Sequence, residues 1–214
     1  MLRTHGAPVL MQISNEKGDF ICVGTSTGSI HVFSVHNQEV RHDCCLDAHE
    51  CAITALASEV GGPKTLASAD QSGKIVTWAS PVFEKESVFA GEGNTVTGLA
   101  FKDDVIIATL ASGTIRLLNA RTAVPIAEIG GHSRVINAID VHPVLDMFVT
   151  AGEDTFVNVW TLPNEATGQE ISVTLNAKVD NAFLTGVRFC GPNMECIAAT
   201  SYDLDQATIF EKVA

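Results

Sequence analysis

The sequence predicts an all-β propeller, and three observations carry that prediction. Short apolar segments that end in a large residue recur along the 214 residues at intervals of about 40–50. Helical periodicity is scarce, whereas β-rich runs are broken by Gly, Asn, Asp and Ser at intervals of roughly ten residues. A four-stranded propeller blade occupies about 40–45 residues, so five repeats are visible. The large residues that end the segments are Phe33, Trp78, Leu118, Trp160 and Phe210.

Each repeat contains three apolar strands in succession, and a more polar outer strand lies between repeats. The second strand of each repeat is a nearly continuous apolar run, which predicts burial on both faces. The expected strands are Val9–Ile13, Phe20–Thr25, Ser29–Val35; Ile53–Ser58, Thr65–Ala69, Lys74–Ser80; Val96–Phe101, Val105–Ala111, Thr114–Ala120; Val135–Val141, Met147–Gly152, Phe156–Leu162; and Leu184–Phe189, Cys196–Ser201, Ala207–Lys212. The outer strands are expected at 40–45, 87–90, 125–130 and 172–176.

These repeats predict one propeller region over 1–214, because no linker rich in Pro, Gly or Ser interrupts them. The approximate bounds of the repeats are 7–35, 36–80, 81–120, 121–162 and 163–214.

Charge and composition exclude several classes of function. The net charge is −12, from 13 basic and 25 acidic residues, which argues against nucleic-acid binding and against attraction to an anionic membrane surface. No apolar run reaches the ~18 residues of a membrane-spanning helix, and no signal peptide is recognisable. We therefore expect a cytoplasmic protein with six reduced cysteines, no direct membrane insertion, and contact with vesicles or membranes only through partners.

The fourth repeat carries the fullest motif. Gly131 and His132 open it, Trp160 closes it, and Asp154 lies in the turn before its last strand. This segment resembles a WD repeat, with Thr161 in place of the Asp of the WD dipeptide. The resemblance implies a buried hydrogen-bonded network, which we carry onto His132, Asp154, Thr150 and Trp160. Its chemistry is reasonable, since a buried imidazole needs partners for both nitrogens.

The other repeats carry this motif less completely. The second repeat has His49 and Trp78, but Ser72 stands at the position of the turn Asp and Asp70 lies two residues earlier, so we expect a weaker copy. The third and fifth repeats lack the opening His, and the first offers only His5 at a looser offset. We expect these three to depend mainly on apolar packing.

Three further segments resemble one particular family of WD repeat proteins. They are GDFICVGTSTGSIHVF, VTAGEDTFVNVW and GVRFC followed by TSYDL, and they resemble the propeller of the WD repeat-containing protein 54 family over most of Gly18–Phe210. The resemblance implies a longer chain with further blades upstream, so the five repeats are expected to be an open part of a seven-bladed propeller. It also implies scaffolds or adaptors without catalytic residues or cofactors.

An open propeller would leave strand edges that can associate with other chains. Residues 1–6 are too few and too polar to form a convincing outer strand, so the first and last repeats are expected to present unpaired strand edges. Such edges favour pairing with another chain. We therefore expect self-association unless upstream blades or a partner cover the edges.

Two letter patterns suggest chemistry that the repeats explain better. The run from Gly24 to Gly28 matches the nucleophile elbow G-x-S-x-G at Ser26, but that motif needs a helix after the Ser and a strand is expected here. A cluster of five potential zinc ligands lacks the paired spacing of structural sites, so we expect no metal. The five are His42, Cys44, Cys45, His49 and Cys51.

The expected working surface is formed by the loops that precede the first strands and by the turns between second and third strands. The candidate partner-binding residues are Glu50, Arg134, Glu153, Tyr202 and Asp203. We expect a non-enzymatic scaffold or adaptor for other proteins, with a preference for basic partners. One alternative is a subunit of a larger trafficking or ciliary assembly that makes its contacts through blade edges. A propeller enzyme is the other, and it would need convergent titratable residues in the central channel, where Ala, Val, Thr and Gly predominate.

Overall fold

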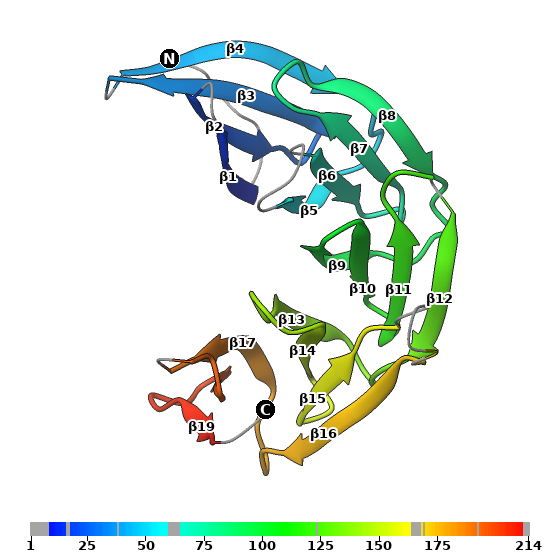
Figure 1. Ribbon diagram of the computed structural model, residues 1–214, viewed down its shortest axis with the longest axis vertical. Coiled ribbons are helices and arrows are strands. Elements are labelled where there is room, and N and C mark those ends of the chain that lie inside the picture. The colour runs from blue at the N-terminus through cyan, green and yellow to red at the C-terminus, as the bar shows by residue number, and fades with distance from the viewer. Residues whose placement is uncertain are drawn as a thin grey trace. The chain divides into compact units, whose positions relative to one another are not determined.

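The fold is all-β in a computed structural model that describes residues 9–15, 18–37, 39–59, 65–122, 124–163, 168, 170–191 and 193–211 (Figure 1). These residues contain nineteen strands and no helix. The all-β prediction is confirmed. The segment 1–6, which we expected not to form an outer strand, lies outside the described residues, as does the end of the last predicted strand at Lys212.

The strands form five antiparallel sheets. The first sheet contains β1 (Val9–Asn15), β2 (Gly18–Gly24), β3 (Ser29–His36) and β4 (Glu39–Asp47); the second contains β5 (Ile53–Ser58), β6 (Thr65–Asp70), β7 (Ile75–Ala79) and β8 (Glu84–Phe89). The third contains β9 (Val96–Lys102), β10 (Val105–Leu110), β11 (Thr114–Asn119) and β12 (Pro125–Gly130). The fourth contains β13 (Ile136–Val141), β14 (Met147–Gly152), β15 (Phe156–Thr161) and β16 (Ser172–Lys178); the fifth contains β17 (Leu184–Cys190), β18 (Cys196–Ser201) and β19 (Thr208–Phe210).

Each sheet is shifted by one strand relative to the sequence repeats. The polar outer strand that follows a third strand pairs with that third strand, as β4 pairs with β3 and β16 pairs with β15. A repeat therefore begins with the last strand of one sheet and continues into the next. The fifth sheet has three strands among the described residues.

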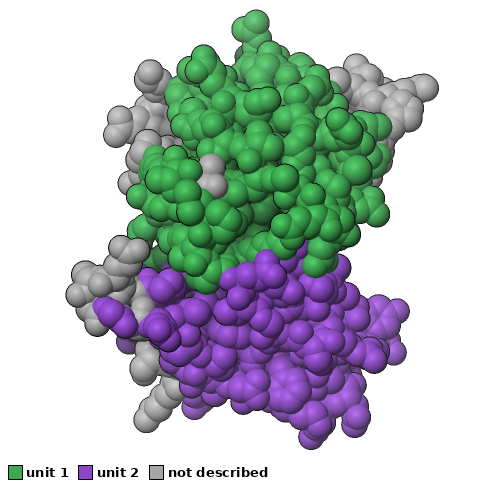
Figure 2. Space-filling view, turned by 90° about the vertical axis from the view of Figure 1, so that its right-hand side faces the viewer, with its two compact units in different colours: residues 1–108, 116–127 green, residues 109–115, 128–214 purple. Residues whose placement is uncertain are grey.

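Two compact units divide the chain (Figure 2). Unit 1 consists of 1–108 with 116–127, and unit 2 of 109–115 with 128–214. That the whole chain forms one propeller region stays a prediction.

Burial follows the order of the strands within a sheet. The second strand is buried along its whole length in β6 and at all positions but the first in β10 and β14. Outer strands such as β8 and β12 alternate between exposed and half-buried positions. The expectation that second strands are buried on both faces is confirmed for β6, β10 and β14, whereas β18 alternates between buried and less buried positions and Thr200 is exposed.

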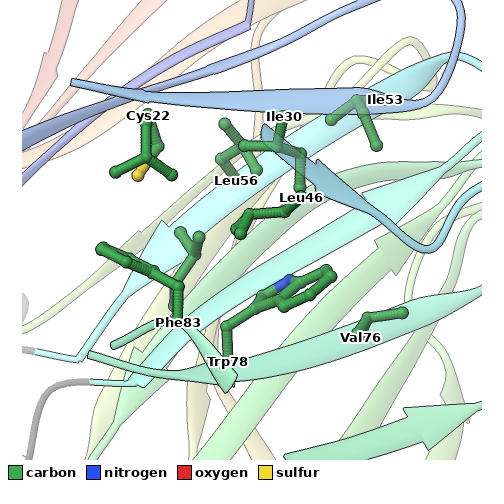
Figure 3. Close-up of a cluster of buried hydrophobic side chains, with 10 residues drawn as sticks. Cys22, Ile30, Leu46, Ile53, Leu56, Val76, Trp78 and Phe83 are labelled. Carbon is green, nitrogen blue, oxygen red and sulfur yellow. The ribbon is translucent and has the colours of Figure 1, made fainter. Parts of the chain in front are cut away.

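Side chains from the first two sheets share one core in unit 1 (Figure 3). Trp78 and Phe83 of the second sheet lie in the same cluster as Cys22 and Ile30 of the first. Phe20 packs edge-on against Phe83, with ring centroids 5.2 Å apart. Unit 2 has an equivalent cluster, in which Val149 and Val157 of the fourth sheet meet Leu184 and Ile197 of the fifth. Apolar packing between consecutive sheets therefore stabilises each unit.

Two cysteines are directly opposed in the fifth sheet, which leads to a first prediction. Cys190 pairs with Cys196 in the register of β17 and β18. Residues opposed in this way have Cα atoms about 4.5–5.5 Å apart and side chains on one face, which suits a disulfide. We expect diamide, a mild thiol oxidant, to join them within one chain. Burial raises the pKa of the Cys22 thiol to about 12, so Cys22 should stay reduced.

Peptide mapping by mass spectrometry checks this expectation. The Cys190→Ser variant is the control, because it should leave Cys196 without its intrachain partner. A first disulfide that involved Cys44 or Cys45 instead would contradict the prediction.

Candidate protein-interaction face

A buried hydrogen-bonded network fixes the loop that opens the fourth sheet. His132 lies in that loop, with its Nδ1 2.8 Å from Asp154 Oδ1 and its Nε2 2.8 Å from Thr150 Oγ1. Trp160 donates its Nε1–H to the same Thr150 oxygen at 2.9 Å. The Asp154 carboxylate can only accept while ionised, so the imidazole donates from Nδ1 and accepts the Thr150 hydroxyl at Nε2. The four residues that the WD resemblance implied are thus linked in one chain of hydrogen bonds.

Asp154 also fixes the surrounding backbone. Its Oδ2 accepts the Ser133 N–H at 2.9 Å, and Oδ1 accepts the Phe156 N–H at 3.3 Å. Burial raises the pKa of this carboxyl group, but the hydrogen bonds from His132 and from the Ser133 N–H outweigh burial and hold the pKa below its usual value. The carboxylate is therefore ionised and ties the loop before β13 to the turn after β14.

The second sheet contains the same network, with its carboxylate displaced along the chain. His49 Nδ1 lies 2.7 Å from Asp70 Oδ2, and His49 Nε2 lies 2.8 Å from Ser68 Oγ. Trp78 Nε1–H donates to Ser68 Oγ at 2.9 Å. The other oxygen of Asp70 accepts from the backbone N–H and the hydroxyl of Ser72, at 2.8 and 2.6 Å. Our interpretation of this repeat as a weaker copy was wrong, because all its hydrogen bonds are present.

The second network is complete because its carboxylate comes from a different position in the turn. Counted back from the Trp, Asp70 stands where the fourth sheet has Gly152. A Cβ placed on Gly152 would lie 2.8 Å from His132 Nδ1 and 3.0 Å from Asp154 Oδ1. Side chains from these two positions therefore reach the same space beside the imidazole. The sequence did contain this signal in Asp70, but the spacing taken from the fourth repeat assigned it no role.

The first and third sheets differ from the second and fourth at the positions of the network, as expected for repeats without the opening histidine. In the third sheet the corresponding positions are Ala108, Leu110 and Leu118, all buried and apolar. In the first sheet Thr25 takes the place of Asp70, and its Oγ1 accepts the Ser29 N–H at 3.1 Å. That these sheets depend mainly on apolar packing stays a prediction.

Three of the five candidate partner-binding residues adjoin the two networks. Glu50 follows His49, Arg134 lies two residues after His132, and Glu153 precedes Asp154. Glu50 and Arg134 are exposed, and Glu153 is half-buried with its N–H bonded to Val135 O at 2.9 Å. Each of the three lies at the equivalent end of its own sheet.

The other two candidates, Tyr202 and Asp203, lie at an apolar surface on the fifth sheet, which we call the Tyr202 patch. It consists of Phe183, Tyr202 and Leu204, which are 50%, 72% and 56% exposed. The Tyr202 N–H donates to Phe183 O at 2.8 Å, which brings the loop before β17 beside the turn after β18. Asp203 and Asp205 lie in the same turn and are exposed. Sequence reasoning missed Phe183 and Leu204, although large apolar residues in a turn are a usable signal.

The two patterns that suggested chemistry have structural explanations. Ser26 is exposed in the turn between β2 and β3, so a strand follows it where a nucleophile elbow needs a helix. Cys44 packs against the core of unit 1 while Cys45 is exposed, so these neighbours face different surroundings. Within the described ranges, no group of three or more Cys, His, Asp or Glu residues is arranged to hold a metal ion. Nor does any described segment form a helix that could span a membrane.

Comparison with known protein families decides the assignment, because the sequence model of the WDR54 family matches residues 7–213 of this chain. The chain belongs to the WDR54 family. It is 31% identical over 203 residues to WD repeat domain 54 of Rattus norvegicus and 31% identical over 205 residues to WD repeat-containing protein 54 of Homo sapiens. These alignments cover 91% and 92% of this chain and 61% of each relative. The chain therefore spans about three fifths of the curated WDR54 relatives it matches.

Solved structures agree with this assignment of the fold. The computationally designed Ika8 protein superposes with a TM-score of 0.75 over 94% of this chain and 57% of that one, at 19% identity. The computationally designed Ika4 protein gives a TM-score of 0.64 over 78% of this chain and 95% of that one, at 22% identity. These likenesses concern the fold alone and confirm the propeller type for this WDR54 member.

The network in the fourth sheet leads to a prediction about stability. We expect His132→Ala to lower the free energy of unfolding by about 1–3 kcal/mol, because Thr150 and Asp154 lose their shared partner inside the protein. Arg134→Ala changes an exposed loop and should cost less than about 0.5 kcal/mol. Urea unfolding of both variants checks this, and equal losses would show that the network does not stabilise the WDR54 fold.

The network in the second sheet predicts a dependence on pH. Burial lowers the pKa of His49, and the hydrogen bond to Asp70 offsets only part of that effect. Below the usual histidine pKa of about 6.5 the unfolded chain binds a proton that folded His49 does not. The free energy of unfolding should therefore fall as the pH drops from 7 toward the lowered pKa, by at most about 1.4 kcal/mol per pH unit from this residue.

The comparison variant is His49→Gln, which keeps polar atoms but does not titrate. Urea unfolding at several pH values should give a shallower slope between pH 7 and 5 for this variant than for the parent chain. Parallel slopes would contradict the assignment of a lowered pKa to His49.

Proposed function

We propose that this chain is a non-enzymatic scaffold or adaptor that binds another protein through the face containing the Tyr202 patch. The observation that carries the proposal is the exposure of Phe183, Tyr202 and Leu204 in a loop and a turn that a backbone hydrogen bond joins, with two exposed aspartates in the same turn. Aromatic and aliphatic side chains that stand exposed together are typical of protein-binding surfaces. Membership of a WD repeat family, whose proteins are generally non-enzymatic scaffolds, supports the same kind of function.

Charge indicates the chemistry of the partner. Asp203 and Asp205 flank the patch, and the whole chain carries a net charge of −12. A partner that places an apolar side chain on Tyr202 beside lysine or arginine would match both features. The same charge disfavours nucleic acid as the partner.

Quantitative affinity capture tests the proposal. The full chain is compared with Tyr202→Ala, Phe183→Ser and, as a matched control, Val173→Ser on the outer strand β16, where Val173 is also exposed. Partners identified by mass spectrometry should be lost from the first two variants and retained by the third. Partners retained by all three variants would contradict the proposed face.

Edge binding, as in a subunit of a larger trafficking or ciliary assembly, is supported by a different observation. Every sheet presents an exposed aliphatic residue on its outermost described strand. These residues are Val40, Val88, Ile126, Val173 and Ile209. Partners lost from Val173→Ser but kept by Tyr202→Ala would favour this alternative. The edge of β19, which pairs only with β18 in the described part of the chain, is our proposed route to self-association.

We further propose a cytoplasmic location, with attachment to vesicles or membranes through partners. The six cysteines are thiols rather than disulfides, which suits a reducing compartment. Fractionation with detergent-free and salt washes tests this, because attachment through acidic and basic surfaces should be released by salt.

A further inference from the structure

A surface pocket lies at the end of the fourth and fifth sheets that is opposite to the Tyr202 patch. It has a volume of about 410 Å³ and is lined by His142, Val144, Leu145, Asn193 and Met194. The first three belong to the turn between β13 and β14, and the last two to the turn between β17 and β18. Tyr202 follows the other end of β18, so neither turn takes part in the face proposed above.

The two turns around the pocket expose three large apolar side chains, two from the turn between β13 and β14 and one from the turn between β17 and β18. Val144 is 79% exposed, Leu145 38% and Met194 37%. Turns favour Gly, Pro, Asn, Asp and Ser, and the corresponding turn of the third sheet has Asp103 and Asp104. Folding therefore does not require apolar side chains at this end of a sheet, and their exposure indicates contact with another molecule.

The pocket walls are held in place before any partner arrives. His142 is buried, and its Nδ1 accepts the N–H groups of Val144 and Leu145 at 3.1 and 2.9 Å. Its ring packs edge-on against Phe189, with centroids 5.1 Å apart. A fixed loop loses little conformational entropy when it binds, so Val144 and Leu145 are well placed for recognition.

Met194 completes the wall in a conformation that does not favour its side chain. Its φ is 58°, in the left-handed region, and its N–H donates to Gly191 O at 3.2 Å. Glycine or asparagine adopts this conformation at lower free energy. A strained residue at a surface site points to a role for the side chain itself.

The charged residues within the described part of the two turns are of one sign. Asp146 and Glu195 lie in the two turns, and neither turn contains Lys or Arg. The closest cation along β17 is Arg188, which is paired with Asp140 at 2.9 Å. A ligand at this pocket therefore meets an apolar floor with acidic groups beside it.

We propose that this pocket is a second protein-binding site, which takes one large apolar side chain from an extended segment of a partner that carries lysine or arginine beside that side chain. The proposal rests on the scaffold function above but concerns a separate site. It gives the scaffold two binding surfaces, at opposite ends of the same pair of sheets. The volume accommodates a Leu, Phe or Trp side chain with its neighbouring backbone.

The test uses a library of random peptides displayed on phage as the probe, selected on the full chain. Enriched peptides are titrated against the parent chain, Met194→Gly and Tyr202→Ala. Met194→Gly removes the pocket wall and suits the left-handed conformation, so this variant should fold and melt at or above the parent temperature. Val144→Ser is a second variant in an exposed turn.

We expect a class of peptides with an apolar residue flanked by Lys or Arg, whose Kd rises about tenfold or more in both Met194→Gly and Val144→Ser. The same Kd should be unchanged in Tyr202→Ala and should rise with salt. Peptides that depend on Tyr202 alone would support the proposed face and overturn this site. Pocket-dependent peptides that lack basic residues would overturn the assigned partner chemistry, and an absence of any Met194-dependent peptide would overturn the site.

Discussion

Replacement of Asp70 by glycine should lower the free energy of unfolding by about 2–4 kcal/mol, and addition of Ser72→Asp should restore most of that loss. Asp70 is almost fully buried and accepts hydrogen bonds from His49, from Ser72 and from the Lys74 N–H. Glycine would leave the buried imidazole and two turn N–H groups without that carboxylate. The double variant instead has the order of residues found in the fourth sheet, with Gly152 and Asp154.

Comparison of these variants separates the effect of having a carboxylate in the turn from the effect of its position in the chain. Urea unfolding of Asp70→Gly, Ser72→Asp and the double variant gives the coupling between the two sites. Ser72→Asp alone should be neutral or destabilising, since two carboxylates would then compete beside one imidazole. A double variant no more stable than Asp70→Gly would show that the two turns are not interchangeable, and that the second network depends on details outside these residues.

The strands were predictable because three apolar runs and one more polar run recur in each repeat, with turn signals between them. Ile53–Ser58, Pro125–Gly130, Met147–Gly152 and Cys196–Ser201 have the predicted bounds. Errors occur at the ends of other strands, such as β4, which is Glu39–Asp47 where 40–45 was expected. Apolar pattern decides which residues enter the core, whereas strand ends depend on pairing with a neighbour that one sequence does not specify.

The candidate sites were less predictable, for a reason that the turns make clear. The sequence identifies Tyr202 as a turn residue, but its neighbour Phe183 is distant in sequence and is brought to it by the pairing of Leu184 with Ser201. The pocket likewise combines Val144 and Met194 from two turns. Surfaces made of several loops depend on which strand ends the topology places together, so single-residue reasoning finds their members and misses the site.

Gly113 of the third sheet and Thr155 of the fourth stand at the same position of their turns. A side chain added to Gly113 should lower the free energy of unfolding, and glycine in place of Thr155 should raise it. Gly113 has φ +87°, and a Cβ on it would lie 2.1 Å from His132 O, the carbonyl of the loop that opens the next sheet. Its own carbonyl accepts the N–H groups of Gly131 and His132, at 3.0 and 2.9 Å. Gly113→Ala should therefore cost about 3 kcal/mol or more, of which left-handed strain accounts for about 1–2 kcal/mol and the backbone clash for the rest.

The fourth sheet has Thr155 at this position, with φ 75°. A β-branched residue is strained there, so Thr155→Gly should raise the free energy of unfolding by about 0.5–1 kcal/mol after the entropic cost of glycine. Gly93→Ala is the control, because φ is +78° but nothing lies within 4 Å of the added Cβ. It should cost only the strain, about 1 kcal/mol. Equal losses for Gly113→Ala and Gly93→Ala in urea unfolding would mean that the loop before β13 yields freely. In that case the close approach of turn and loop could not be what holds His132 in its network.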